Sequence, residues 1–195
     1  TFSWTRAAVV GISNAAGSGT GNISETLTNT TSSPIAVTYV YTVSASSCTN
    51  PTTYSVVVNI TPVPTLSSTL TPPAICSGTA FSYTPTSATS GATFSWSRAA
   101  VAGISNAAAS GSGNPNETLT DTIATPVNVT YVYTVSANGC TNATTYNVVV
   151  AVNPAPTLTS TTSPSAICSG TTFNYTPTSA TSGVTFSWTR ATVAN

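Results

Sequence analysis

The residue types that carry out most protein chemistry are rare in this chain, so those present can be considered one by one. Its 195 residues include three basic residues, three acidic residues, four cysteines and no His. Arg6 and Arg98 each have a glutamate 19 residues later, Glu25 and Glu117, while Arg190 has none. The repeated spacing predicts an ion pair that pins one strand to a later segment. The alternative is two solvated surface charges, worth under about 1 kcal/mol even if paired.

The four cysteines also recur at a fixed interval. Cys48 and Cys140 are 92 residues apart, as are Cys76 and Cys168. An even number of cysteines in a β-rich domain indicates disulfides and an oxidising compartment, and a metal or redox role is disfavoured because the chain lacks CxxC pairs and His. Counting favours a Cys76–Cys140 bond within one domain. Strand direction places these two at opposite ends of a sandwich and favours a bond between domains, with the partner of Cys76 near position 232, outside this chain.

Three tryptophans, Trp4, Trp96 and Trp188, recur at the same interval of 92 residues. We expect them in the core together with Tyr131 and Tyr133, because a Trp on the third strand of a sandwich usually packs inside. The alternative is a platform on which sugar rings stack, and it requires exposed rings.

Hydroxyl groups have replaced charge in the composition. Only 3% of the residues are charged, against about 25% in an ordinary domain, whereas Thr and Ser number 42 and 29. The chain lacks the basic patch that nucleic acids or anionic membranes require, the clustered carboxylates of calcium sites and the usual general bases. No apolar run reaches the length of a membrane span. We therefore expect no catalytic residue, cofactor, metal or membrane insertion, while the aromatic and Val content argues against disorder.

An internal repeat of 92 residues organises the chain. The opening TFSWTRAAV returns as TFSWSRAAV at 93–101 and as TFSWTRATV at 185–193, and residues 1–92 align with 93–184 without gaps, with 65 identities. A period of this length corresponds to one domain. Proline-flanked joints predict that 1–63 is the back of one repeat, 64–155 a complete repeat and 156–195 the front of a third. Since no initiator Met or signal peptide is present, we expect a section of a longer tandem array.

The complete repeat is predicted to be all-β. Apolar and hydroxyl-bearing residues alternate with a period of two, most clearly over 127–136 and 145–152, and no helical stripe is present. This pattern predicts an immunoglobulin-like β-sandwich of about seven strands. We expect the strands near 65–70, 79–84, 92–97, 117–123, 127–136 and 145–152. The small, polar stretch 103–116 is interpreted as a surface loop or weak edge.

Four segments together resemble a known family: AICSGT at 74–79, TFSW at 93–96, TYVYTV at 130–135 and NGCT at 138–141. They are similar to the PKD-like, immunoglobulin-like tandem repeats of very large surface proteins in gliding bacteria of the Bacteroidetes group. The resemblance implies a secreted, surface-anchored adhesin or stalk, exported by the type IX route and often linked to gliding motility. It also implies an O-glycosylation motif at Asp121-Thr122-Ile123, although Asn29 replaces the Asp in the first repeat.

The leading interpretation is a non-catalytic structural repeat at the bacterial cell surface, part of the stalk or filament of an adhesin. Its partners would be neighbouring repeats and, through lateral association, other stalks; no pattern identifies a glycan or surface ligand. The alternative is a carbohydrate-binding module of a secreted protein, which requires exposed Trp96 and Tyr131. An ice-binding surface is disfavoured by the irregular spacing of Thr.

Overall fold

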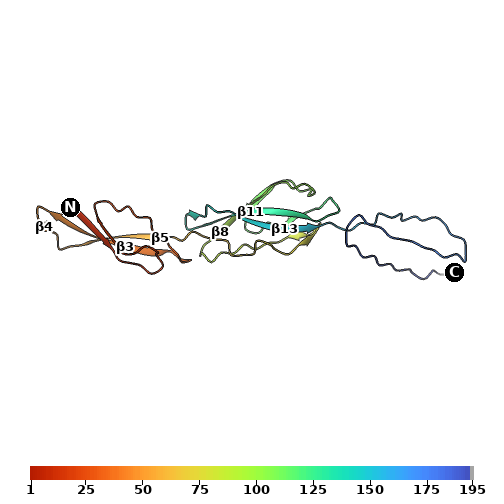
Figure 1. Cartoon of the computed structure of the whole chain (residues 1–195), viewed down its shortest axis with the longest axis horizontal. Helices are drawn as coiled ribbons and strands as arrows, with labels where there is room; N and C mark the ends of the chain where they lie inside the picture. Colours follow the sequence, from red (N-terminus) through yellow and green to blue (C-terminus); the bar gives the residue numbers. More distant parts are fainter. Residues whose placement is uncertain (194–195) are drawn as a thin grey trace. The chain divides into compact units, whose positions relative to one another are not determined.

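The computed structural model describes residues 1–193, and its regular structure consists of β-strands (Figure 1). The predicted all-β class is confirmed. Within these residues no helix is long and apolar enough to cross a membrane. The contacts divide the chain into two compact units. The first contains Thr1–Ser68, Thr84–Trp96 and Tyr133–Tyr146, and the second contains Thr69–Tyr83, Ser97–Val132 and the residues from Asn147 onward.

The first sheet lies within the first unit. Its strands are β1 (Phe2–Arg6), β2 (Gly17–Thr20), β3 (Ile35–Ala45), β4 (Cys48–Thr49) and β5 (Tyr54–Ile60). The order is β2-β1-β3-β4, with β5 also paired to β3, and all pairings are antiparallel. Alternation along β1 and β3 gathers Trp4, Val37 and Tyr39 into a core with Ile12. Gly19 on β2 is required there, since a Cβ at this position would lie within 3 Å of the Trp4 indole.

The second sheet repeats the first at the interval of 92 residues. Its strands are β6 (Ile75–Cys76), β8 (Thr93–Arg98), β9 (Ala109–Ser112), β11 (Val127–Ala137), β12 (Cys140–Thr141) and β13 (Tyr146–Asn153). The order is β6-β13-β11-β8-β9, with β12 paired to β11. A separate antiparallel pair joins β7 (Ala80–Phe81) to β10 (Glu117–Thr118). This arrangement of sheets is consistent with a β-sandwich domain.

The core of the complete repeat follows from strict alternation along two long strands. On β11, the four residues Val129, Tyr131, Tyr133 and Val135 have no exposed surface, and on β13 the same holds for Val148, Val150 and Val152. From β7, Phe81 is 1% exposed and its ring centroid lies 5.0 Å from that of Tyr131. Burying each Val contributes about 1.5–3 kcal/mol. The hydrophobic face of β11 and β13 therefore provides much of the stability of this repeat.

The predicted strands match the observed ones except towards the front of each repeat. No strand forms over 65–70; one hydrogen bond, from Val149 N to Leu70 O at 2.8 Å, joins this segment to β13. Prolines at 62, 64, 72 and 73 remove ladder donors on both sides of the segment. The strand expected over 79–84 is reduced to β7, and the stretch 103–116 contains the short edge strand β9. Among the described residues after Asn153 no strand is present.

We expect Val150→Ala to lower the free energy of unfolding of its repeat by about 2–3 kcal/mol, because it leaves a cavity at a fully buried position. Val58→Ala is the matched control at the equivalent position of β5. Val58 is 40% exposed, so this substitution should cost less than about 1 kcal/mol. Hydrogen exchange in urea over peptides 127–153 and 35–60 measures the two repeats separately. Equal costs would contradict the difference in burial.

Candidate functional site

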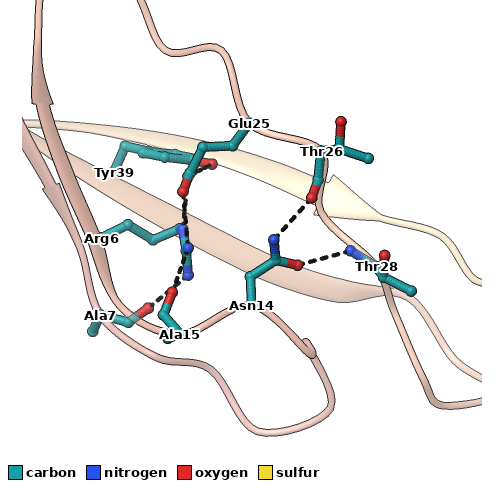
Figure 2. A network of polar contacts seen from close by, with 8 residues as sticks. All are labelled: Arg6, Ala7, Asn14, Ala15, Glu25, Thr26, Thr28 and Tyr39. Atoms are coloured by element: carbon teal, nitrogen blue, oxygen red, sulfur yellow. Dashed lines mark hydrogen bonds and ion pairs between the residues drawn. The ribbon is translucent and has the colours of Figure 1, made fainter.

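Most of the charged side chains of the chain form two copies of one buried cluster. In the first copy, Arg6 on β1 and Glu25 form a bidentate ion pair: Arg6 Nε donates to Glu25 Oε2 at 2.9 Å and Nη2 to Oε1 at 3.0 Å. The hydroxyl of Tyr39 on β3 donates to the same Oε2 at 2.6 Å. Figure 2 shows the three side chains converging from two strands and the intervening segment. We call this the Arg–Glu–Tyr cluster.

Backbone oxygens accept the remaining donors of the arginine. Arg6 Nη2 donates to Ala15 O at 2.6 Å and Nη1 to Ala7 O at 3.2 Å (Figure 2). Only 3% of Arg6 is exposed. A guanidinium buried to this extent is tolerated because its charge is paired and its donors are satisfied. The cluster thus ties β1 both to β3 and to the chain between them.

The second copy has the same geometry at positions 92 residues later. Arg98 Nε and Nη2 donate to Glu117 Oε2 and Oε1, both at 2.9 Å, and Tyr131 OH donates to Oε2 at 2.7 Å. Arg98 also donates to Ala107 O at 2.7 Å and to Ala99 O at 3.2 Å, and it is 2% exposed. The structure therefore brings together the four residues for which the 19-residue spacing predicted ion pairs.

Sheet register and an asparagine position these side chains. Arg6 and Tyr39 are Cα partners across β1 and β3, so both point to the same face. Asn14 holds the segment that contains Glu25: its Nδ2 donates to Thr26 O at 2.8 Å, and its Oδ1 accepts from Thr28 N at 3.1 Å (Figure 2).

Sequence reasoning missed the tyrosine and asparagine roles in these clusters. Two signals were available. An asparagine recurs 11 residues before each glutamate, as Asn14 and Asn106. A tyrosine that is expected in the core also needs a partner for its hydroxyl, and the paired glutamate supplies it.

The electrostatics of the cluster favour a fixed charge state. Hydrogen bonds from Arg6, and then from Tyr39, lower the pKa of Glu25 from 4.5 to about 2. Burial, followed by the hydrogen bond to Glu25, raises the pKa of Tyr39. In the second copy the pKa of Glu117 is lowered mainly by Arg98, and that of Tyr131 is raised mainly by burial. Because a general acid or base works best with a pKa near the ambient pH, these groups are suited to holding strands together rather than to proton transfer.

The aromatic residues lie in the predicted core with one exception. Trp4 and Trp96 are each 7% exposed, and Tyr131 and Tyr133 are fully buried. These rings cannot form a sugar-stacking platform. Trp188 is 85% exposed, so its placement in the core is wrong for this structure. The reason is local: the described residues around Trp188 form no strand against which the ring could pack.

The intradomain disulfide between Cys76 and Cys140 is also corrected, since all four cysteines, Cys48 and Cys168 included, are free. Cys76 on β6 pairs with Asn153 at the end of β13, whereas Cys140 lies on β12, beside the connection that leads to the start of β13 at Tyr146. A strand of eight residues is about 25 Å long, far beyond the Cα separation of a disulfide, which is under about 7 Å. A bond between domains stays a prediction.

The remaining sequence candidates are held in turns. The Thr122 hydroxyl donates to Gly103 O at 3.1 Å, and Asp121 Oδ1 accepts from Ile123 N at 2.9 Å. Glycosylation of Thr122 stays a prediction. Among the described residues, no group of three or more His, Cys, Asp or Glu side chains is arranged to hold a metal ion.

Comparison with known families supports the fold. A family model described as a PKD-like domain matches residues 73–156, so the chain contains a PKD-like domain over this range. Neither the curated proteins nor the solved structures that were searched include a match to the chain.

We expect Glu117→Gln to destabilise its repeat by about 3 kcal/mol, because the substitution leaves the buried charge of Arg98 without its partner. Asp121→Asn is the matched control: it also removes one negative charge, and the first repeat carries Asn at this position. The control should cost less than about 1 kcal/mol. Hydrogen exchange in urea over residues 93–137 measures both. Similar costs for the two variants would contradict the structural role of the ion pair.

Acid should destabilise the first repeat through Glu25. Since its folded-state pKa of about 2 lies below the ordinary value of 4.5, the carboxylate stabilises the fold fully above about pH 4.5, and this contribution is lost as the pH falls towards 2. The urea midpoint of peptides 1–60 should therefore fall between pH 5 and pH 2. In Glu25→Gln the midpoint should be lower at neutral pH and should change less over this interval. An equally steep acid transition in the variant would assign the effect to another group.

Proposed function

We propose that the chain is a non-catalytic structural repeat region of a bacterial cell-surface adhesin, where it forms part of a stalk or filament. The PKD-like domain at residues 73–156 supports this proposal, because such domains are typical of extracellular repeat regions and are usually non-catalytic. Export by the type IX route and a link to gliding motility belong to the same proposal and rest on the resemblance of the repeat motifs.

The observation that carries the proposal is that both repeats use their few charges in the same internal way. Arg6 and Arg98 are almost completely buried, and each is paired with a glutamate that also accepts a tyrosine hydroxyl. A binding or catalytic module commonly places such groups where a ligand can reach them. Here they connect strands, which is what a load-bearing or spacing domain requires.

The carbohydrate-binding alternative has less support. Its candidate rings, Trp96 and Tyr131, are buried. An open groove of about 350 Å³ on the first sheet is lined by Phe2, Tyr41 and Tyr54, among others. In the complete repeat the equivalent of Tyr41 is Tyr133, which has no exposed surface. The aromatic groove is therefore not a shared property of the repeats.

We expect the purified chain to leave adhesion unchanged when it is added in excess to cells that display the parent adhesin, because a spacer does not compete for the ligand. The matched experiment deletes residues 64–155 in frame from the parent. The deletion joins Val63 to Pro156 and so restores the sequence type of the natural joint. It should preserve binding of soluble ligand and shorten the reach by about 30–40 Å, the length of a strand such as β11 if the strands run along the stalk.

Two outcomes would contradict the proposal. Competition by the purified chain, or loss of soluble-ligand binding in the deletion, would place the ligand site in this region. A glycan array probed with the same chain distinguishes the carbohydrate-binding alternative, since binding to a defined class of sugar would favour it. The expected result is no binding above that of an unrelated β-sandwich.

A further inference from the structure

One apolar face of the first sheet is uncovered. Val56 and Val58 of β5 are 48% and 40% exposed, although Val148 and Val150, at the same positions of the next repeat, have no exposed surface. An open groove of about 450 Å³ lies over this face. Its lining includes Glu25, Leu27, Tyr39, Val56, Val58 and Ile60. We call it the open groove. It exposes a surface that the fold buries in its complete repeat.

Residues 70–83 cover the equivalent face of the complete repeat. Ile75 on β6 lies opposite Val152 in a parallel pairing with β13. The ring of Phe81 packs 5.0 Å from that of Tyr131, and β7 pairs with β10. In the first repeat the corresponding residues would precede Thr1.

A later segment of the chain has the sequence and the internal contacts of this cover. Over 156–184, the rings of Phe173 and Tyr175 stack at 6.3 Å and 12°, as those of Phe81 and Tyr83 do at 6.1 Å and 15°. The hydroxyl of each tyrosine donates to the carbonyl oxygen 14 residues earlier, at 2.8 Å and 2.9 Å respectively. Yet Phe173 is 53% exposed and Phe81 only 1%. The segment thus has the local shape of the cover with its apolar side exposed.

We propose that the open groove binds residues 156–184 of a second copy of this chain, so that copies associate head to tail. By the 92-residue correspondence, Phe173 of the second copy lies on Tyr39, and Ile167 lies opposite Ile60. Because the segment already has its bound conformation, association loses little conformational entropy. The contact is apolar and the segment contains no charged residue, so salt has little effect on it. The inference goes beyond the structural role proposed above and does not depend on it.

The same placement brings two cysteines together across the contact. Cys168 corresponds to Cys76, which pairs with Asn153, so the docked segment places Cys168 opposite Thr61 of the receiving chain. Thr61 Oγ1 lies 2.7 Å from Cys140 Sγ. The Cys168 and Cys140 thiols of two chains are then within reach of each other. Oxidised glutathione can take two electrons from them: the thiols lose two protons, an S–S bond forms between the chains, and the oxidant becomes two molecules of reduced glutathione.

Sedimentation velocity of the full chain with a reductant, over a series of concentrations, tests the association. We expect oligomers that grow with concentration and change little with added salt. Phe173→Ser should weaken the association at least about 30-fold, because it removes a central buried ring from the contact. Trp188→Ser is the matched control: Trp188 is 85% exposed and lies in the stretch 185–193, which only duplicates β1 of the receiving chain. It should leave the association unchanged. A monomer at all concentrations, or equal weakening by both substitutions, would overturn the proposal.

A disulfide experiment tests the register. One chain keeps only Cys140, a second keeps only Cys168, all other cysteines being replaced by Ser, and the two are mixed with oxidised glutathione. We expect the mixed disulfide to exceed both self-dimers. A mixture in which a chain keeping only Cys48, which is also exposed, replaces the Cys140 chain should show no such excess. A statistical distribution of products would overturn the proposal. An intrachain bond in a chain that keeps both Cys140 and Cys168 would also overturn it, since it would show docking within one copy.

Discussion

The pairing of a buried guanidinium with one carboxylate is the interaction on which the rest of each repeat depends. The segment between β1 and β3 consists largely of Gly, Ala, Ser, Thr and Asn, and it has few apolar side chains to bury. Its position relative to the sheet is set by Arg6, which reaches Ala15 and Glu25 in this segment while Glu25 also accepts from Tyr39. Because the whole chain has only three acidic residues, nothing nearby could replace the glutamate.

The scarcity of charge elsewhere is balanced by hydroxyl groups. Thr and Ser on the outer faces of strands bond to each other across strands, as Ser3 and Thr42 do at 3.2 Å and Ser136 and Thr141 do at 2.8 Å. Alternation therefore gives an apolar inner face and a polar, uncharged outer face. The exposed edge strand β9 is short and consists of small residues, which limits edge-to-edge pairing in a protein without repelling surface charges.

The sequence predicts most of the central sheet, because alternation is a local signal. The strands expected over 127–136 and 145–152 agree with β11 and β13 to within about a residue. The first strand could not be found in this way. It is β6, two residues long, and its existence depends on a parallel pairing with a strand about 77 residues away. The same pairing decides the cysteine question: direction along β13 separates Cys76 from Cys140, whereas counting cysteines does not consider direction. For the site, the spacing of Arg and Glu indicated a pair, but the third member, Tyr131, was visible only as a core residue.

The division of each repeat into a sheet and a separate cover has a consequence for assembly. The apolar face of β3 and β5 is closed only when a segment like 70–83 lies on it, and the two repeats share 65 of 92 residues. A cover from one repeat therefore offers nearly the same side chains to any sheet of this type. Chemical recognition between repeats is then weak, and the selection of the correct cover depends on chain connectivity. A covalent link holds the native cover at an effective concentration in the millimolar range, well above that of a cover on another molecule. Identical repeats can therefore fold in register while they are linked, and they exchange covers when a sheet and its own cover are not joined, which is the characteristic failure of repeat proteins.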